Sequence, residues 1–231
     1  MCSEMCIRDR TNALTITSGG GAVGISGLIG AGTNGALGNV AINATDTTDT
    51  GAISLAGIGS GTAASGAGIV GTVNIGSNKT ATLTLGGTTY NTDGNTSYQS
   101  ITGSDKILIT GTDPVFTTHD DTIAFSTGGI KLTAGEFEVQ SGGNGITIDG
   151  RIVGNSANGA HAESVKLDAG TGDGTNAVVT LSSTTGIGAG DEISTIAIRG
   201  NGKILLDGAI KTSEANGDEG SAPSLTLTGA V

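Results

Sequence analysis

The sequence predicts an all-β protein whose short strands coil into a parallel β-helix, or β-solenoid. Three observations predict this fold: short alternating apolar segments recur, Gly separates them, and one stretch of sequence is repeated. Of the 231 residues, 43 are Gly, whereas Gly makes up about 7% of a typical globular protein. We expect one elongated solenoid domain over residues 11–231.

The predicted strands are three-residue segments in which two apolar residues flank one that is usually small or polar. This is the period-two pattern of a strand with one buried face. Gly, Asn, Asp and Ser flank the segments and favour tight turns. The segments are Leu14–Ile16, Val40–Ile42, Ile53–Leu55, Val73–Ile75, Leu83–Leu85, Ile107–Ile109, Ile130–Leu132, Phe137–Val139, Ile146–Ile148, Val165–Leu167, Val179–Leu181, Ile196–Ile198, Ile204–Leu206 and Leu225–Leu227.

The repeat joins residues 143–159 (GNG-ITIDGRIVGNSANG) to residues 200–217 (GNGKILLDGAIKTSEANG), with 10 of 17 aligned positions identical. An offset of 57–58 residues is too long for one coil, and it suits two or three coils of roughly 20–30 residues. Coils of about 20–25 residues would give roughly 9–11 coils. The alternative fold is a set of β-sandwich repeats, but the predicted strands are spaced by 7 to 26 residues, whereas a sandwich favours about 8–12.

Residues 1–10 differ in composition from the rest of the chain. They contain both Cys and both Met, and Ser3–Arg10 resembles the translation of a sequencing adapter. We therefore expect residues 1–10 to be a non-native leader and exclude them from the fold. We expect the rest to be an internal part of a longer protein, flanked by further repeats of the same chain.

The middle of the chain, residues 90–140, is less regular than the rest. All five aromatic residues lie between Tyr90 and Phe137. Two interpretations remain open: an irregular stretch of the same solenoid, or a loop or insertion that collects binding residues.

Charge and composition exclude several functions. The net charge of −11 argues against nucleic acid and anionic membranes as partners. No apolar run approaches the roughly 18 residues of a membrane-spanning helix, so we expect no direct membrane insertion. Gly-x-Gly-x-x-Gly occurs three times, but nothing around it indicates a helix or a βαβ unit, so we expect no cofactor.

Two kinds of metal site are conceivable from the sequence. Residues 173–176 and 216–219 are oxygen-rich turns of the type that calcium prefers, and His119-Asp120-Asp121, with Asp113 nearby, is a cluster of a His and carboxylates. The β-roll calcium motif needs Asp where Thr147 stands. Solvated turns explain both features better, and we assign no metal site.

A polysaccharide-active β-helix enzyme would need paired carboxylates, or Asp with a cation, on one exposed face. Asp149 and Asp207 occupy equivalent repeat positions, which indicates a turn role. We therefore assign no catalytic residue. The candidates are Asp149, Asp168, Asp191, Asp207, Arg151 and Arg199.

Three segments, Gly38–Ala44, Gly51–Leu55 and Val179–Gly188, resemble the repeats of filamentous-haemagglutinin-like exoproteins, which include many autotransporter passengers. The resemblance implies a secreted or surface-held bacterial β-helix rod, extracellular and adhesive, and it supplies no catalytic residues. We expect a non-enzymatic rod that presents a binding surface to cell-surface glycans or proteins. The alternative function is a polysaccharide lyase or hydrolase.

Overall fold

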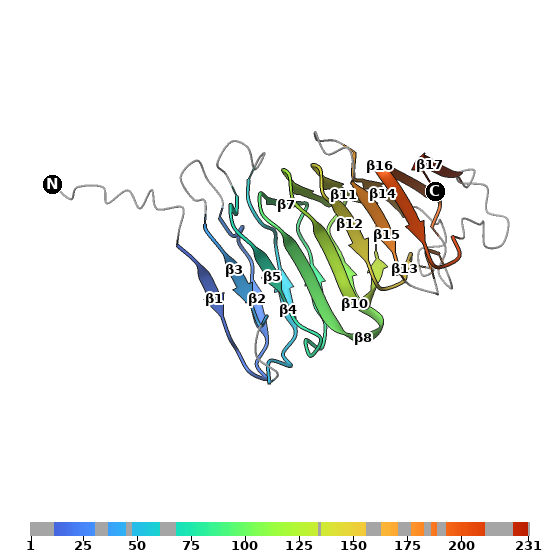
Figure 1. Ribbon diagram of the computed structural model, residues 1–231. Coiled ribbons are helices and arrows are strands. Elements are labelled where there is room, and N and C mark those ends of the chain that lie inside the picture. The colour runs from blue at the N-terminus through green and yellow to red at the C-terminus, as the bar shows by residue number, and fades with distance from the viewer. Residues whose placement is uncertain are drawn as a thin grey trace.

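In the computed structural model the described residues form strands and no helix, and the strands coil into a β-solenoid (Figure 1). The structure describes residues 12–30, 37–44, 48–60, 68–133, 135–155, 163–170, 177–182, 186–188, 193–210 and 224–230. The strands are β1 (Leu14–Ile16), β2 (Val23–Ile25), β3 (Val40–Ile42), β4 (Ile53–Leu55), β5 (Val73–Ile75), β6 (Leu83–Leu85), β7 (Thr89–Thr92), β8 (Thr96–Ile109), β9 (Val115–Thr118), β10 (Ile123–Leu132), β11 (Glu136–Ser141), β12 (Gly145–Ile148), β13 (Ile152–Val153), β14 (Ser164–Asp168), β15 (Val178–Leu181), β16 (Thr195–Leu206) and β17 (Ser224–Ala230).

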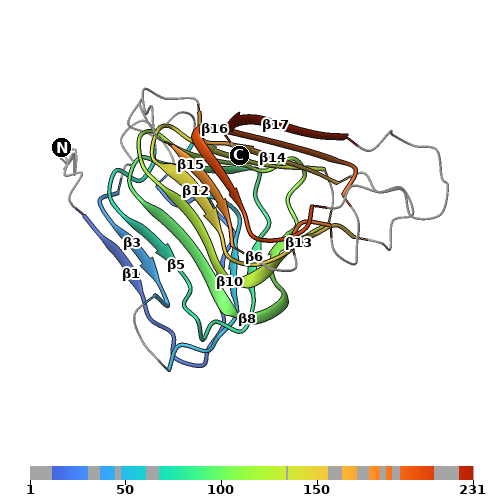
Figure 2. The same ribbon diagram turned by 45° about the vertical axis from the view of Figure 1, so that its right-hand side comes forward.

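The strand pairs of the described residues are parallel, and they form three ladders that enclose the core. The first ladder runs β1, β3, β5, β8, β10, β12, β15, β16. The second runs β2, β4, β6, β8, β10, β13. The third runs β7, β9, β11, β14, β16, β17. Figure 2 shows third-ladder strands β14 and β17 crossing at an angle to first-ladder strands β12 and β15.

Every strand segment predicted from the sequence is confirmed, but the predicted coil length is too short. The coil from Ile130 to Ile152 takes 22 residues, whereas the coil from Ile152 to Ile187 takes 35. The solenoid therefore has fewer coils than predicted. The sequence repeat spans two coils, because Ile146 pairs with Val179 and Val179 pairs with Ile204.

The inward side chains of each ladder stack in columns of aliphatic residues. Val40, Ile42, Val73 and Ile75 are fully buried, as the alternating pattern predicts. Burying apolar surface contributes about 25 cal/mol per Å², so these columns stabilise the packing of each coil on the next.

The corners between ladders bring successive coils close together. At one corner the Oδ1 of Asn39 accepts a hydrogen bond from the Thr72 amide (3.0 Å), and the Oδ1 of Asn95 accepts one from the Thr122 amide (3.1 Å). At another corner a Cβ on Gly87 would lie 1.8 Å from the carbonyl oxygen of Ala56, so a side chain does not fit there. Asn and Gly at corners thus hold coils in contact.

The aromatic residues form one buried cluster in the middle of the rod. Tyr90 of β7 stacks on Phe116 of β9 with 4.3 Å between ring centroids, and Tyr98 of β8 stacks on Phe125 of β10 at 5.0 Å. Phe137 meets Phe116 and Phe125 edge to face. The Tyr90 hydroxyl donates to the carbonyl of Leu55, and burial raises the pKa of Tyr90 to about 12.

The sequence left two interpretations of residues 90–140: an irregular stretch of solenoid, or a projecting loop or insertion. For the aromatic residues these contacts favour the first. Tyr90, Tyr98, Phe116, Phe125 and Phe137 are each at most 1% exposed, and β7 to β11 pair in register with the coils on either side. The aromatic side chains face inward and widen the core, so they form no projecting binding patch.

The aromatic cluster predicts a large effect of truncation. Replacing Phe116 with Ala should lower the free energy of unfolding by about 3–5 kcal/mol, because the change leaves a cavity among four rings. Chemical denaturation followed by far-UV circular dichroism measures the effect. The control is Thr117→Ala at the next, outward-facing position, which should change stability by less than about 0.5 kcal/mol. Equal effects of both variants would contradict this packing.

Candidate functional site

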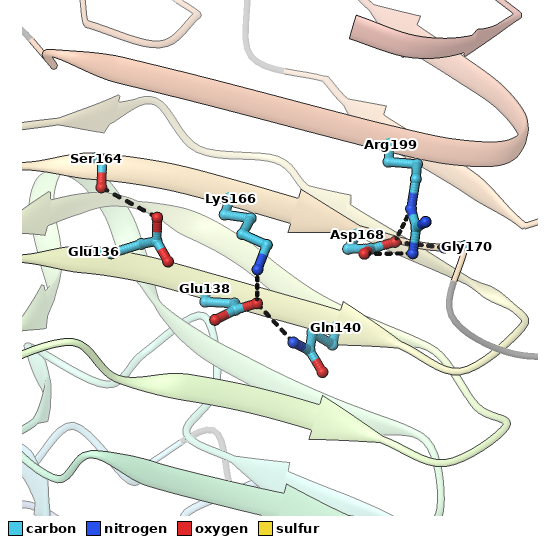
Figure 3. A network of polar contacts seen from close by, with 8 residues as sticks. All are labelled: Glu136, Glu138, Gln140, Ser164, Lys166, Asp168, Gly170 and Arg199. Atoms are coloured by element: carbon cyan, nitrogen blue, oxygen red, sulfur yellow. Dashed lines mark hydrogen bonds and ion pairs between the residues drawn. The ribbon is translucent and has the colours of Figure 1, made fainter. Parts of the chain in front are cut away.

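Charged and polar side chains line the outer side of three neighbouring third-ladder strands (Figure 3). Because side chains alternate along a strand, every second residue of β11, β14 and β16 points outward there. Parallel register sets these residues side by side on successive coils. We call this set the polar face: Glu136, Glu138, Gln140, Ser164, Lys166, Asp168, Ala197 and Arg199.

The first ion pair of the polar face joins β11 to β14. The Nζ of Lys166 lies 2.5 Å from the Oε1 of Glu138, and the amide nitrogen of Gln140 donates to the same oxygen at 2.6 Å. The hydrogen bond to Glu138 raises the pKa of Lys166. The carboxylate is 13% exposed and the ammonium-bearing side chain 42%.

The second ion pair joins β14 to β16. The Nε of Arg199 donates to the Oδ1 of Asp168 at 2.7 Å, and its Nη2 donates to Oδ2 at 2.6 Å. Such a bidentate pair fixes the plane of the guanidinium. The backbone amide of Gly170 also donates to Asp168. The hydrogen bonds that Arg199 donates to the Asp168 carboxylate raise the pKa of Arg199.

In both ion pairs the cationic side chain is more exposed to solvent than the carboxylate. The Asp168 carboxylate is 12% exposed and the Arg199 side chain 47%, which repeats the arrangement of Glu138 and Lys166. The polar face therefore presents two cations that lie over two sheltered carboxylates. Such an arrangement can donate hydrogen bonds to a ligand, while the carboxylates hold the cations in place.

The structure separates the other carboxylate candidates from this face. Asp149 and Asp207 lie at exposed corners, where their amides donate to Phe125 and Leu181 at 3.0 Å each. These two bonds are equivalent and two coils apart, so both residues have the turn geometry that their repeat positions indicate. Arg151 forms an ion pair with Asp105 at 3.1 Å, and Asp191 lies outside the described residues.

The cluster around His119 forms a corner contact across two coils. The Nδ1 of His119 lies 2.8 Å from Asp120 and 3.7 Å from Asp93 on the preceding coil. Asp113 lies at the opposite end of β9, where it accepts a hydrogen bond from the Glu136 amide. Among the described residues, no group of three or more His, Cys, Asp or Glu is arranged to hold a metal ion.

The oxygen-rich turns at residues 173–176 and 216–219, and the leader at residues 1–10, lie outside the described residues. Thr147, which stands where a calcium β-roll needs Asp, lies in the middle of strand β12.

Sequence reasoning found Asp168 and Arg199 as candidates, but it missed Glu138, Lys166 and their arrangement. The sequence did carry a signal: the middle residue of Phe137–Val139 and that of Val165–Leu167 are charged, and both segments were predicted as strands. The signal could not be placed on one face, because coil lengths vary and the register between coils does not follow from spacing.

Comparisons with family models, with curated proteins and with solved structures found no match to this chain. In the part of the chain that the structure describes, no helix has the length and hydrophobicity needed to cross a membrane.

The unequal exposure within the Asp168–Arg199 pair predicts unequal effects of substitution. Arg199→Gln leaves a sheltered carboxylate without its cation and should cost about 1–3 kcal/mol of stability. Asp168→Asn leaves an exposed guanidinium in water and should cost less. Denaturant midpoints of both variants measure the difference, and a larger loss for Asp168→Asn would contradict the arrangement.

A pH effect is expected at the His119 corner. Burial raises the pKa of Asp121, and the neighbouring Asp93 and Asp120 add to the increase. A raised folded-state pKa means that the folded chain loses stability as pH rises from the unfolded value, about 3.9, through the folded value. Asp121→Asn should therefore stabilise the protein at pH 7, with the gain shrinking below about pH 4.

Thermal unfolding between pH 3 and pH 8 measures this effect. The control is the unchanged protein, measured over the same pH range. A gain for Asp121→Asn that does not depend on pH would contradict the electrostatic explanation.

Proposed function

We propose that the chain is a non-enzymatic, adhesive segment of an extracellular, secreted or surface-held repeat protein. In this function it acts as a rigid rod that presents its outer faces to glycans or proteins on neighbouring cells. The resemblance of its repeats to filamentous-haemagglutinin-like exoproteins supports this proposal, as does the absence of Cys from residues 11–231.

The observation that carries the proposal is the continuity of the ladders. First-ladder pairing runs without a break from Leu14 to Ile204, and the third ladder continues to β17. Figure 1 shows the chain advancing along the rod from the N-terminal to the C-terminal strands. Because each coil packs on the next, the outer residues of successive coils keep fixed relative positions. Repeat proteins use such extended, rigid surfaces for binding.

The surface of the rod supports contact with a partner rather than with nucleic acid or lipid. On the polar face Lys166 and Arg199 are each paired with a carboxylate, so they form no basic stripe for phosphates. The net charge of −11 adds repulsion from polyanions.

A second candidate function is a polysaccharide-active enzyme. Asp168 and Arg199, two of the residue types that such chemistry needs, come together on one exposed face. Both carboxylate oxygens of Asp168, however, accept hydrogen bonds from Arg199, and one also accepts a hydrogen bond from the Gly170 amide, so neither oxygen is open to a substrate. The adhesive function therefore takes precedence.

The proposed function predicts attachment without turnover. Beads coated with the protein should bind cultured epithelial cells or bacterial cells several-fold more than beads coated with serum albumin. Microscopy with counted beads measures attachment, and trypsin or periodate treatment of the cells distinguishes protein from glycan partners.

Two results would overturn the proposal. One is attachment equal to that of the albumin beads on every cell type. The other is a fall in the viscosity of polygalacturonate, alginate or xylan on incubation with the protein that Asp168→Asn abolishes, which would establish the enzymatic alternative.

A further inference from the structure

The polar face contains a hollow of about 250 Å³ between β14, β16 and β17. The residues that line it come from three successive coils. They include Lys166, Asp168, Ala197, Arg199, Thr226 and Thr228.

Two features of the sequence create this hollow. Ala197 has only a methyl group at the outward position between Lys166 of β14 and Thr226 of β17, with which it is in register. In addition, Lys166 and Arg199 both point toward the preceding strand, where Glu138 and Asp168 hold them (Figure 3). The space above Ala197 is therefore left unfilled by the long side chains beside it.

The lining combines apolar and hydrogen-bonding groups. The Ala197 methyl and the alkyl stems of Lys166 and Arg199 offer C–H surface. A guanidinium has five N–H donors, and the bonds to Asp168 use those of Nε and one on Nη2. Thr226 supplies a hydroxyl that both donates and accepts.

This combination matches a pyranose ring, which has C–H faces and a rim of hydroxyls. Acidic sugars fit less well, because both cations are already neutralised and the chain carries a net charge of −11. We infer that the hollow around Ala197 is a binding subsite for one pyranose unit of a neutral glycan. The inference rests on the proposed adhesive function and names the ligand class and the place where it binds.

The test is a titration of the ¹⁵N-labelled full chain, followed by amide chemical shifts. The probes are the neutral oligosaccharides maltohexaose, cellohexaose and chitohexaose, with hexagalacturonate as the acidic comparison. At least one neutral probe should shift amides of β14, β16 and β17 at millimolar concentration, and hexagalacturonate should bind at least tenfold more weakly.

Two variants localise the site. Ala197→Gln fills the hollow and should weaken binding at least tenfold. The matched control is Ala124→Gln, which places the same side chain at an outward, half-buried position of β10 in the first ladder and should leave binding unchanged. Far-UV circular dichroism and unfolding midpoints verify that both variants fold, and Arg199→Lys, which loses the planar fork, provides a second variant that should bind more weakly.

The inference is overturned if no neutral hexasaccharide shifts these amides, if hexagalacturonate binds more tightly, or if folded Ala197→Gln binds like the unchanged protein. Because this measurement involves no cells, its failure is distinct from failure of the proposed function. Beads that still attach to cells while the titration is negative would place adhesion on another surface.

Discussion

The stacking of each coil on its neighbour through parallel backbone hydrogen bonds is the constraint on which the rest of the structure depends. Neighbouring strands in a sheet lie about 4.8 Å apart, and inward side chains must repeat at that spacing in columns. The columns through Val40 and Val73 satisfy this with aliphatic residues. Corners must bring backbones together, which explains why Gly87 faces the Ala56 carbonyl at a distance that excludes a side chain.

The same constraint decides what the outer surface can do. Register that places Val139, Leu167 and Ile198 in one buried column also places their outward neighbours in columns on the polar face. The ion pairs Lys166–Glu138 and Arg199–Asp168 thereby form between successive coils, although their members are far apart in the sequence. A solenoid can thus build a composite surface from single residues on several coils.

The sequence predicted the strands well because each needs only a local signal. Leu83–Leu85 and Ile146–Ile148 alternate and are bounded by turn residues, and both are strands. Strands β2, β7, β9 and β13 were not predicted. Of these, β7 and β9, with sequences TYNT and VFTT, carry hydroxyl and amide groups at positions where the predicted strands have aliphatic residues. In β7 the inward Thr92 is buried because its hydroxyl bonds to Thr96, a partner that periodicity does not reveal.

The polar face was only half predictable for a different reason. Asp168 and Arg199 were identified by residue type, but their contact depends on the length of the coil between them, which is set by corners of variable length. The sequence also showed that all the aromatic residues lie in the middle of the chain. Their burial could not be predicted, because it depends on which residues of β7 to β11 point into the core. Local patterns thus predict strands, while contacts between coils require the register.

The gathering of every aromatic ring in the middle coils has a spectroscopic consequence. The protein has no Trp, and both of its Tyr residues lie in this one cluster. Intrinsic fluorescence and near-ultraviolet circular dichroism therefore report on β7 to β11 alone. Unfolding of the coils at either end of the rod would not change these aromatic signals, but it would change far-ultraviolet circular dichroism, which reports on the backbone. Comparing the aromatic and backbone signals would therefore distinguish unfolding that starts at the ends from unfolding that starts at the centre.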